Sequence, residues 1–151
     1  MLMKITSPAF LNNSPIPEEF TCKGPNASPP LQIEGVPAGA LELALVVEDP
    51  DAPGRIWQHW LVWNIDPTTT EIIAGAKPTG AVEGITDFGS PGYGGPCPPS
   101  GTHRYHFKLF ALDAPLLLAA SAGRAELNQA MAGHILAEAD LVGLFGHNQK
   151  A

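Results

Sequence analysis

The sequence predicts a mainly β fold with one helix near the C-terminus. Three observations lead to this prediction. Several short runs rich in β-branched, aromatic and other apolar residues are separated by turn-forming residues. The chain contains 16 glycines and 16 prolines, a content that suits strands joined by turns better than long helices. Only one segment, residues 124–138, places apolar side chains at helical spacing.

The N-terminal half is expected to form four strands, at residues 4–7, 31–34, 41–48 and 57–65. Residues 43–47 are all apolar, which indicates a strand that is buried on both faces. In the fourth strand, simple alternation would place His59 and Leu61 on one face and Trp60 on the other.

The C-terminal half is expected to continue the β pattern around the single helix. Tyr105, Phe107 and Leu109 would share one face of a strand, with Arg104, His106 and Lys108 on the other. The expected elements are short strands within 71–88, a loop at 90–101, a strand at 104–113, the helix at 124–138 and a strand at 141–145.

Length and composition narrow the class of protein. The 151 residues suit one domain, 1–151, with 44% hydrophobic and 15% charged residues. The net charge is −7 and there is no basic cluster, which argues against nucleic acid or an anionic membrane as a partner. No apolar run approaches the roughly 20 residues of a spanning helix, so no membrane insertion is expected.

The cytoplasm is the expected location, because the N-terminus has no apolar stretch of signal-peptide length. Two cysteines, Cys22 and Cys97, are too few for a disulfide scaffold and do not form a metal-type pair. We therefore expect two free thiols, as is usual in a reducing compartment.

Polar chemistry concentrates in three segments beside predicted strands. Asp49 and Asp51 flank a proline that restricts their backbone, His59 lies between aromatic residues, and His103 lies where a Gly/Pro-rich loop enters a strand. Each has an ordinary structural interpretation, such as a turn with surface aspartates or a core histidine. Together they supply the groups of an anion pocket or of a metal site.

Longer strings around these residues resemble one known family. DPDAPG, HWLVWNI and YGGPCPPSGTHRYHF, with TCKGPNASPPL and MAGHILAEADLVGLFG nearer the termini, look like the phosphatidylethanolamine-binding protein family, which includes the Raf kinase inhibitor protein. The match spans nearly the whole chain and is similar to the small bacterial branch. The resemblance implies a large antiparallel sheet packed on a smaller one, and one pocket for phosphate-type head groups.

The resemblance also assigns roles to particular residues. It implies a buried ion pair between Asp51 and Arg104 that holds two motif loops together. The pocket residues that it implies are Asp49, His59, His103 and Tyr105.

Elementary chemistry is consistent with an anion at such a site. Protonated imidazoles attract a phosphate and donate hydrogen bonds to it, and a neighbouring aspartate favours the charged ring. Backbone N–H groups of Tyr93, Gly94 and Gly95 are expected to complete the cradle, because glycine lets the chain approach a ligand closely. The predicted function is non-enzymatic binding of a small phosphate-type anion, without a cofactor.

Three other functions stay open at this point. Asp49, Asp51, His59 and His103 are residue types that bind zinc or manganese, as in a metal-dependent hydrolase. An enzyme could use His103 as a general base, with Cys97 as the only candidate nucleophile. Regulation of a protein partner, by inhibiting a kinase or protease, is implied only by the family resemblance.

Further expectations concern geometry and assembly. The Ala52–Pro53 bond is predicted to be cis, since proline offers the one inexpensive cis peptide in the DPDAP turn. A homodimer is expected by analogy with small bacterial relatives. Of the other histidines, His106 should face away from His103, His134 should pack in the core from the helix, and His147 should be solvated.

Overall fold

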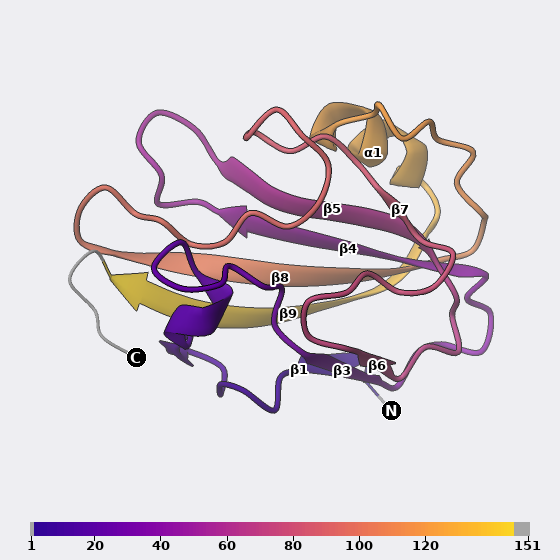
Figure 1. The fold of residues 1–151 in the computed structure, drawn as a ribbon. Coiled ribbons are helices and arrows are strands. Elements are labelled where there is room, and N and C mark those ends of the chain that lie inside the picture. Colours follow the sequence, from indigo (N-terminus) through magenta and orange to yellow (C-terminus); the bar gives the residue numbers. More distant parts are fainter. Residues whose placement is uncertain (1, 147–151) are drawn as a thin grey trace.

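The structure is a computed structural model that describes residues 2–146, and His147 therefore lies outside the described residues. No helix within 2–146 is long and apolar enough to cross a membrane. Figure 1 shows the helices and strands, which are β1 (Lys4–Thr6), β2 (Ser14–Pro15), the 3-10 helix η1 (Glu18–Phe20), β3 (Leu31–Glu34), β4 (Glu42–Asp49), β5 (Trp57–Ile65), β6 (Glu71–Ile72), β7 (Val82–Glu83), β8 (Thr102–Leu112), α1 (Arg124–Met131) and β9 (Ile135–Gly146).

The strands form two sheets. The larger has six strands in the order β2-β9-β8-β4-β5-β7, and the smaller has three in the order β1-β3-β6. All pairings are antiparallel except the short parallel contact of β2 with β9. The mainly β architecture with a large and a small sheet, predicted from the sequence, is confirmed.

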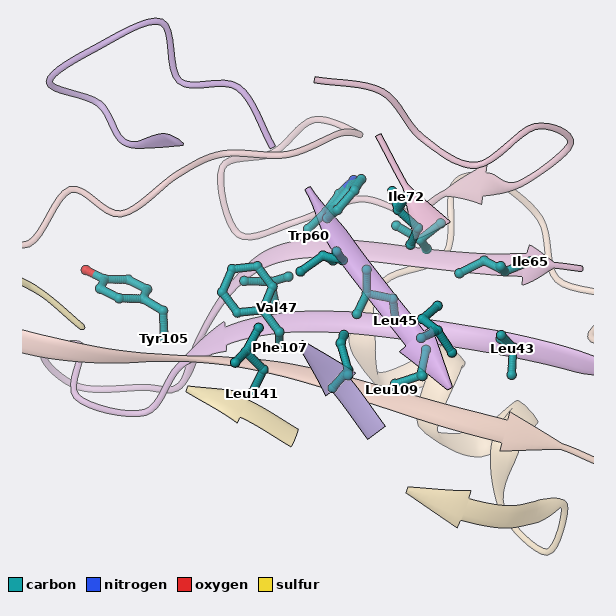
Figure 2. Packing of buried hydrophobic residues seen from close by; sticks show 14 of the residues in the cluster. Leu43, Leu45, Val47, Trp60, Ile65, Ile72, Tyr105, Phe107, Leu109 and Leu141 are labelled. Carbon is teal, nitrogen blue, oxygen red and sulfur yellow. The ribbon is translucent and has the colours of Figure 1, made fainter. Parts of the chain in front are cut away.

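The central strand β4 supplies apolar side chains to both faces of the large sheet. Leu43, Leu45 and Val47 point into a core between the two sheets, whereas Ala44 and Val46 pack under α1. All eight residues of β4 are buried, as the continuous apolar run predicted. Figure 2 shows the core between the sheets, with side chains from β4, β5 and β8 meeting those of β6 and β9.

The predicted helix 124–138 is wrong in its second half. The helix ends at Met131, Gly133 adopts a positive φ of 80°, and the chain continues as β9 from Ile135. Pairing of β9 with the whole length of β8 satisfies the backbone of this segment, so tertiary hydrogen bonding overrides the helical spacing. His134 is consequently exposed and pairs with Asp113 instead of packing in the core.

Two local predictions are also wrong. The described residues contain no cis peptide bond, so Ala52–Pro53 is trans, and the turn after β4 is accommodated by a positive φ of 79° at Gly54. Cys22 and Cys97 are joined by a disulfide rather than being free. The backbones of their segments lie side by side, since the Cys22 N–H donates to the Pro96 carbonyl at 3.1 Å.

Candidate functional site

Three neighbouring strands bring the predicted pocket residues to one end of the large sheet. Asp49 is the last residue of β4, which lies between β5 and β8. His59 belongs to β5, and His103 and Tyr105 stand near the start of β8. All four side chains line one cavity of about 320 Å³.

Asp49 and His103 form a buried pair among the residues that line the cavity. His103 Nδ1 lies 2.6 Å from Asp49 Oδ2, and both residues are buried. A carboxylate only accepts hydrogen bonds, so the pair places a proton on Nδ1 and leaves Nε2 as the ring nitrogen that can meet a ligand. Asp49 is itself fixed, because its Oδ1 accepts the Asp51 N–H at 2.8 Å.

A β-bulge places His59 in the cavity. Val47 pairs with Trp60 and Glu48 with Gln58, so His59 has no direct partner on β4. Trp60 joins the core between the sheets, whereas Leu61 packs under α1. The prediction that His59 shares a face with Leu61, opposite Trp60, is therefore wrong.

The ring of His59 is fixed by the loop that precedes β8. Its Nδ1 lies 2.6 Å from the Gly94 carbonyl, which only accepts, so Nδ1 carries a proton. Burial lowers the pKa of His59, and the Gly94 carbonyl and Asp49 offset this shift in part. A neutral His59 with the proton on Nδ1 presents the lone pair of Nε2.

Tyr105 adds a neutral donor to the same cavity. Burial raises the pKa of its phenol, which therefore stays protonated. A protonated phenol keeps its O–H, which can donate to a ligand in the cavity. Figure 2 shows this hydroxyl at one end of the row of β8 side chains, directed away from Phe107 and Leu109.

Two aromatic side chains that the sequence analysis did not assign to the site complete the cavity. Phe88 packs edge-on against His59 at 5.3 Å between ring centroids, and against Trp57 at 5.5 Å. Trp57 was visible as part of an aromatic cluster, but the sequence carried no signal for Phe88, which comes from the loop after β7. The remaining lining residues are Ala52, Pro53, Cys97, Pro98 and Pro99.

Asp51 and Arg104 form the ion pair that the resemblance implies. Arg104 Nη2 and Nε lie 2.8 and 3.0 Å from the two carboxylate oxygens, and the Arg104 backbone N–H donates to Oδ2 at 2.9 Å. The expectation of a buried pair is wrong, since the Arg104 side chain is 57% and the Asp51 side chain 28% exposed. The guanidinium hydrogen bonds lower the pKa of Asp51 to about 2.

Removing the guanidinium should reverse that shift. In an Arg104→Ala variant we expect the pKa of Asp51 to rise from about 2 toward the unperturbed value of 3.8. The carboxyl titration of Asp51, followed by NMR, measures this directly. Asp66 is the internal control, because hydrogen bonds from Thr68 lower its pKa and the substitution leaves them intact. An Asp51 pKa that stays near 2 would contradict the assigned cause.

Of the three backbone N–H groups expected to form a cradle, at Tyr93, Gly94 and Gly95, the two glycine groups are bonded within the protein. Gly94 N–H donates to the His59 carbonyl at 3.0 Å, and Gly95 N–H donates to Asn26 Oδ1 at 2.9 Å. These residues line an adjacent hollow, and the Tyr93 hydroxyl donates to the Phe20 carbonyl at 2.7 Å. Gly94 therefore contributes by orienting His59 rather than by donating N–H bonds to an anion.

The side chains considered for a metal site do not converge. The carboxylate of Asp51 is directed to Arg104, and Asp49 is paired with His103 Nδ1. Within residues 2–146, no group of three or more His, Cys, Asp and Glu side chains is arranged to hold a metal ion. The geometry gives no support to the metal-dependent hydrolase.

The fold and the cavity define a class of protein: a two-sheet β domain with an aspartate, two histidines and a tyrosine in one pocket at the end of the large sheet. A family model described as phosphatidylethanolamine-binding protein matches residues 6–146. The chain belongs to the phosphatidylethanolamine-binding protein family.

Relatives and solved structures agree with this assignment. A UPF0098 protein of Methanothermobacter thermautotrophicus is 47% identical over 148 residues, which are 95% of this chain and 98% of the relative. The crystal structure of a phosphatidylethanolamine-binding protein homologue from Chlamydia trachomatis is 41% identical, with a TM-score of 0.92 over 95% of this chain and 97% of that one. Escherichia coli YbcL is 33% identical, with a TM-score of 0.90 over 97% and 99%.

Proposed function

We propose that the cavity binds a small phosphate-type anion, or the phosphoryl group of a larger ligand, without converting it. One observation carries the proposal: two histidine rings line one cavity, and each has its Nδ1 fixed by an acceptor of the protein. Fixed rings present Nε2 to a ligand at little cost in conformational entropy. The donors to the anion are the Nε2–H groups of His59 and His103, when each ring is charged, and the Tyr105 hydroxyl.

Asp49 explains how an acidic protein can hold an anion. The net charge of −7 repels an anion at long range, so local groups must supply the attraction. One oxygen of Asp49 is bonded to the His103 ring and the other accepts the Asp51 N–H, so the carboxylate holds this imidazole in place. The carboxylate thus acts through His103 rather than on the ligand.

Binding without catalysis fits the chemistry of the cavity walls. The one nucleophile considered from the sequence, Cys97, is held in a disulfide. Regulation of a protein partner, such as a kinase or a protease, is a further hypothesis from the family. The cytoplasm stays the predicted location, although a disulfide is more typical of an oxidising compartment.

The proposal requires that anion binding weaken as pH rises. Burial lowers the pKa of His59 in the empty pocket below 6.5, and a bound anion would raise it by favouring the charged ring. Binding then takes up a proton. The affinity is therefore constant at pH values below the pKa that His59 has in the empty pocket, and it falls as pH rises from that value to the higher pKa that His59 has in the complex. We expect sulfate and phosphate affinity to fall between about pH 6 and pH 8.

Calorimetric titration with sulfate at several pH values tests this expectation. Sulfate stays fully ionised over this range, so any pH dependence belongs to the protein. The charged and titratable groups around His59 are Asp49, Asp87, His103 and Tyr105. His106→Ala is the control, because this ring pairs with Asp140 away from the cavity. Affinity that is independent of pH would contradict a role for the histidines.

The homodimer stays a prediction. Among residues 2–146, no strand lies beside the first half of β9 on its outer edge, since β2 pairs only with Gly143 and Leu144. Ile135 and Leu136, in this part of the strand, are 40% and 44% exposed. We expect light scattering at micromolar concentration to give the mass of two chains, and a monomer mass would contradict the prediction.

A further inference from the structure

One wall of the cavity is covalently tied to the N-terminal segment. Cys97 lines the cavity together with Pro98 and Pro99, and its disulfide partner Cys22 lies 75 residues earlier, just after η1. The link therefore joins the loop 90–101 to a part of the chain that does not itself line the cavity.

The loop has little regular structure of its own. Between β7 and β8, the loop takes part in β pairing through the isolated bridge of Ile85 with Pro91. Around the disulfide, the loop is also held by the Cys22 N–H on the Pro96 carbonyl and the Gly95 N–H on Asn26. At Gly95 the two segments touch, since a Cβ there would lie 2.3 Å from Asn26 Oδ1 and 2.4 Å from the Phe20 carbonyl oxygen.

The same loop orients His59 and lines the cavity beside Tyr105. Gly94 exchanges hydrogen bonds with His59, through its carbonyl to Nδ1 at 2.6 Å and through its N–H to the His59 carbonyl at 3.0 Å. Cys97 lines the same cavity as the Tyr105 phenol. A displacement of the loop would therefore disturb the ring of His59 and the cavity wall beside Tyr105 together.

The disulfide is open to solvent. Cys22 and Cys97 are both exposed, whereas Gly95 and Pro96 beside them are buried. Exposed disulfides are the ones that reductants reach and that serve regulatory roles. The bond thus joins two exposed residues, while Gly95 and Pro96, which contact the N-terminal segment, are buried.

We infer that the Cys22–Cys97 disulfide is a redox switch of the anion pocket, which binds well when oxidised and weakly when reduced by a dithiol. The inference rests on the proposed anion binding. A thiolate of the dithiol attacks one sulfur and forms a mixed disulfide, and its second thiol then displaces that sulfur. The protein gains two electrons and two protons as Cys22 and Cys97 become thiols, and the dithiol becomes a cyclic disulfide.

Calorimetric sulfate titration of the whole protein tests the switch in three states: oxidised, reduced with dithiothreitol, and reoxidised. We expect the dissociation constant to rise at least about tenfold on reduction, the effect of losing one charge-assisted hydrogen bond, and to return on reoxidation. Hydrogen exchange should accelerate at Gly94 and Gly95, which belong to the loop, and stay slow in β4.

A variant with both cysteines replaced by serine is the matched control. It should bind like the reduced protein and show no response to dithiothreitol. Equal affinity of the oxidised and reduced proteins would overturn the switch and leave the proposed function intact. Absence of sulfate binding by the oxidised protein would overturn both. Loss of protection throughout β4 on reduction would also overturn the switch, because the effect would then be global unfolding.

Discussion

Replacing His103 with alanine is expected to lower the affinity for phosphate more than about tenfold, which corresponds to a loss of more than about 1.5 kcal/mol. The substitution removes the charge-assisted donor and leaves the buried carboxylate of Asp49 without its partner at 2.6 Å. The site cannot compensate, because Asp49 Oδ1 is already bonded to the Asp51 N–H and the other imidazole of the cavity, that of His59, is held by Gly94.

Calorimetry with phosphate and with sulfate measures this loss. His134→Ala is the matched control, since this histidine also pairs with an aspartate, Asp113, but is exposed and is not among the residues that line the cavity. The control should bind both anions as the unmodified protein does. Full binding by a His59→Ala and His103→Ala double variant would remove this cavity from the proposed function.

Strands were predictable where local pattern and tertiary environment agree. The boundaries of β3 and β5 were predicted to the residue, and β4 was recognised as doubly buried from its apolar run. The second half of the predicted helix failed because helical spacing and strand alternation are both compatible with the alanine-rich segment after Gly133. Which pattern prevails depends on the pairing of β9 with β8, which a local pattern does not contain.

The chemical groups of the site were predictable, but their arrangement was only partly so. Asp49, His103 and the pair of Asp51 with Arg104 follow from motifs whose residues lie close in sequence to strand ends. The orientation of His59 depends on a bulge between β4 and β5, which shifts the alternation by one residue. No composition or spacing in the strand signals that bulge.

The walls of the cavity were the least predictable part. Phe88 and the loop 90–101 lie outside helices and strands, so no helical or strand-like spacing of apolar residues could indicate their positions. The contact of Cys22 with Cys97 depends on how η1 and this loop meet in three dimensions, and the expectation of free thiols rested on the small number of cysteines and on the expected reducing compartment. Contacts between irregular segments far apart in sequence are set by tertiary packing, which explains why this disulfide was missed.

Removing the disulfide is expected to cause a large loss of stability, about 2–4 kcal/mol in the free energy of unfolding. A cross-link between residues 75 apart restricts the unfolded chain strongly, and chain-entropy estimates are about 3 kcal/mol for a 15-residue loop and 4.7 for a 100-residue loop. Cys22 and Cys97 are exposed, so serine at both positions leaves the hydrophobic core intact and isolates the effect of the cross-link.

Chemical denaturation of the oxidised protein and of the Cys22→Ser and Cys97→Ser double variant measures the difference, and thermal unfolding should show a midpoint lower by roughly 5–15 °C. The reduced unmodified protein is the control and should match the double variant, because both lack only the covalent link. The denaturant slope should increase in the double variant, since an unfolded chain without the cross-link exposes more surface. Equal unfolding free energies for the oxidised protein and the double variant would contradict this prediction. Either Cys22 and Cys97 would then not be linked in the folded protein, or the link would not reduce the conformational freedom of the unfolded chain.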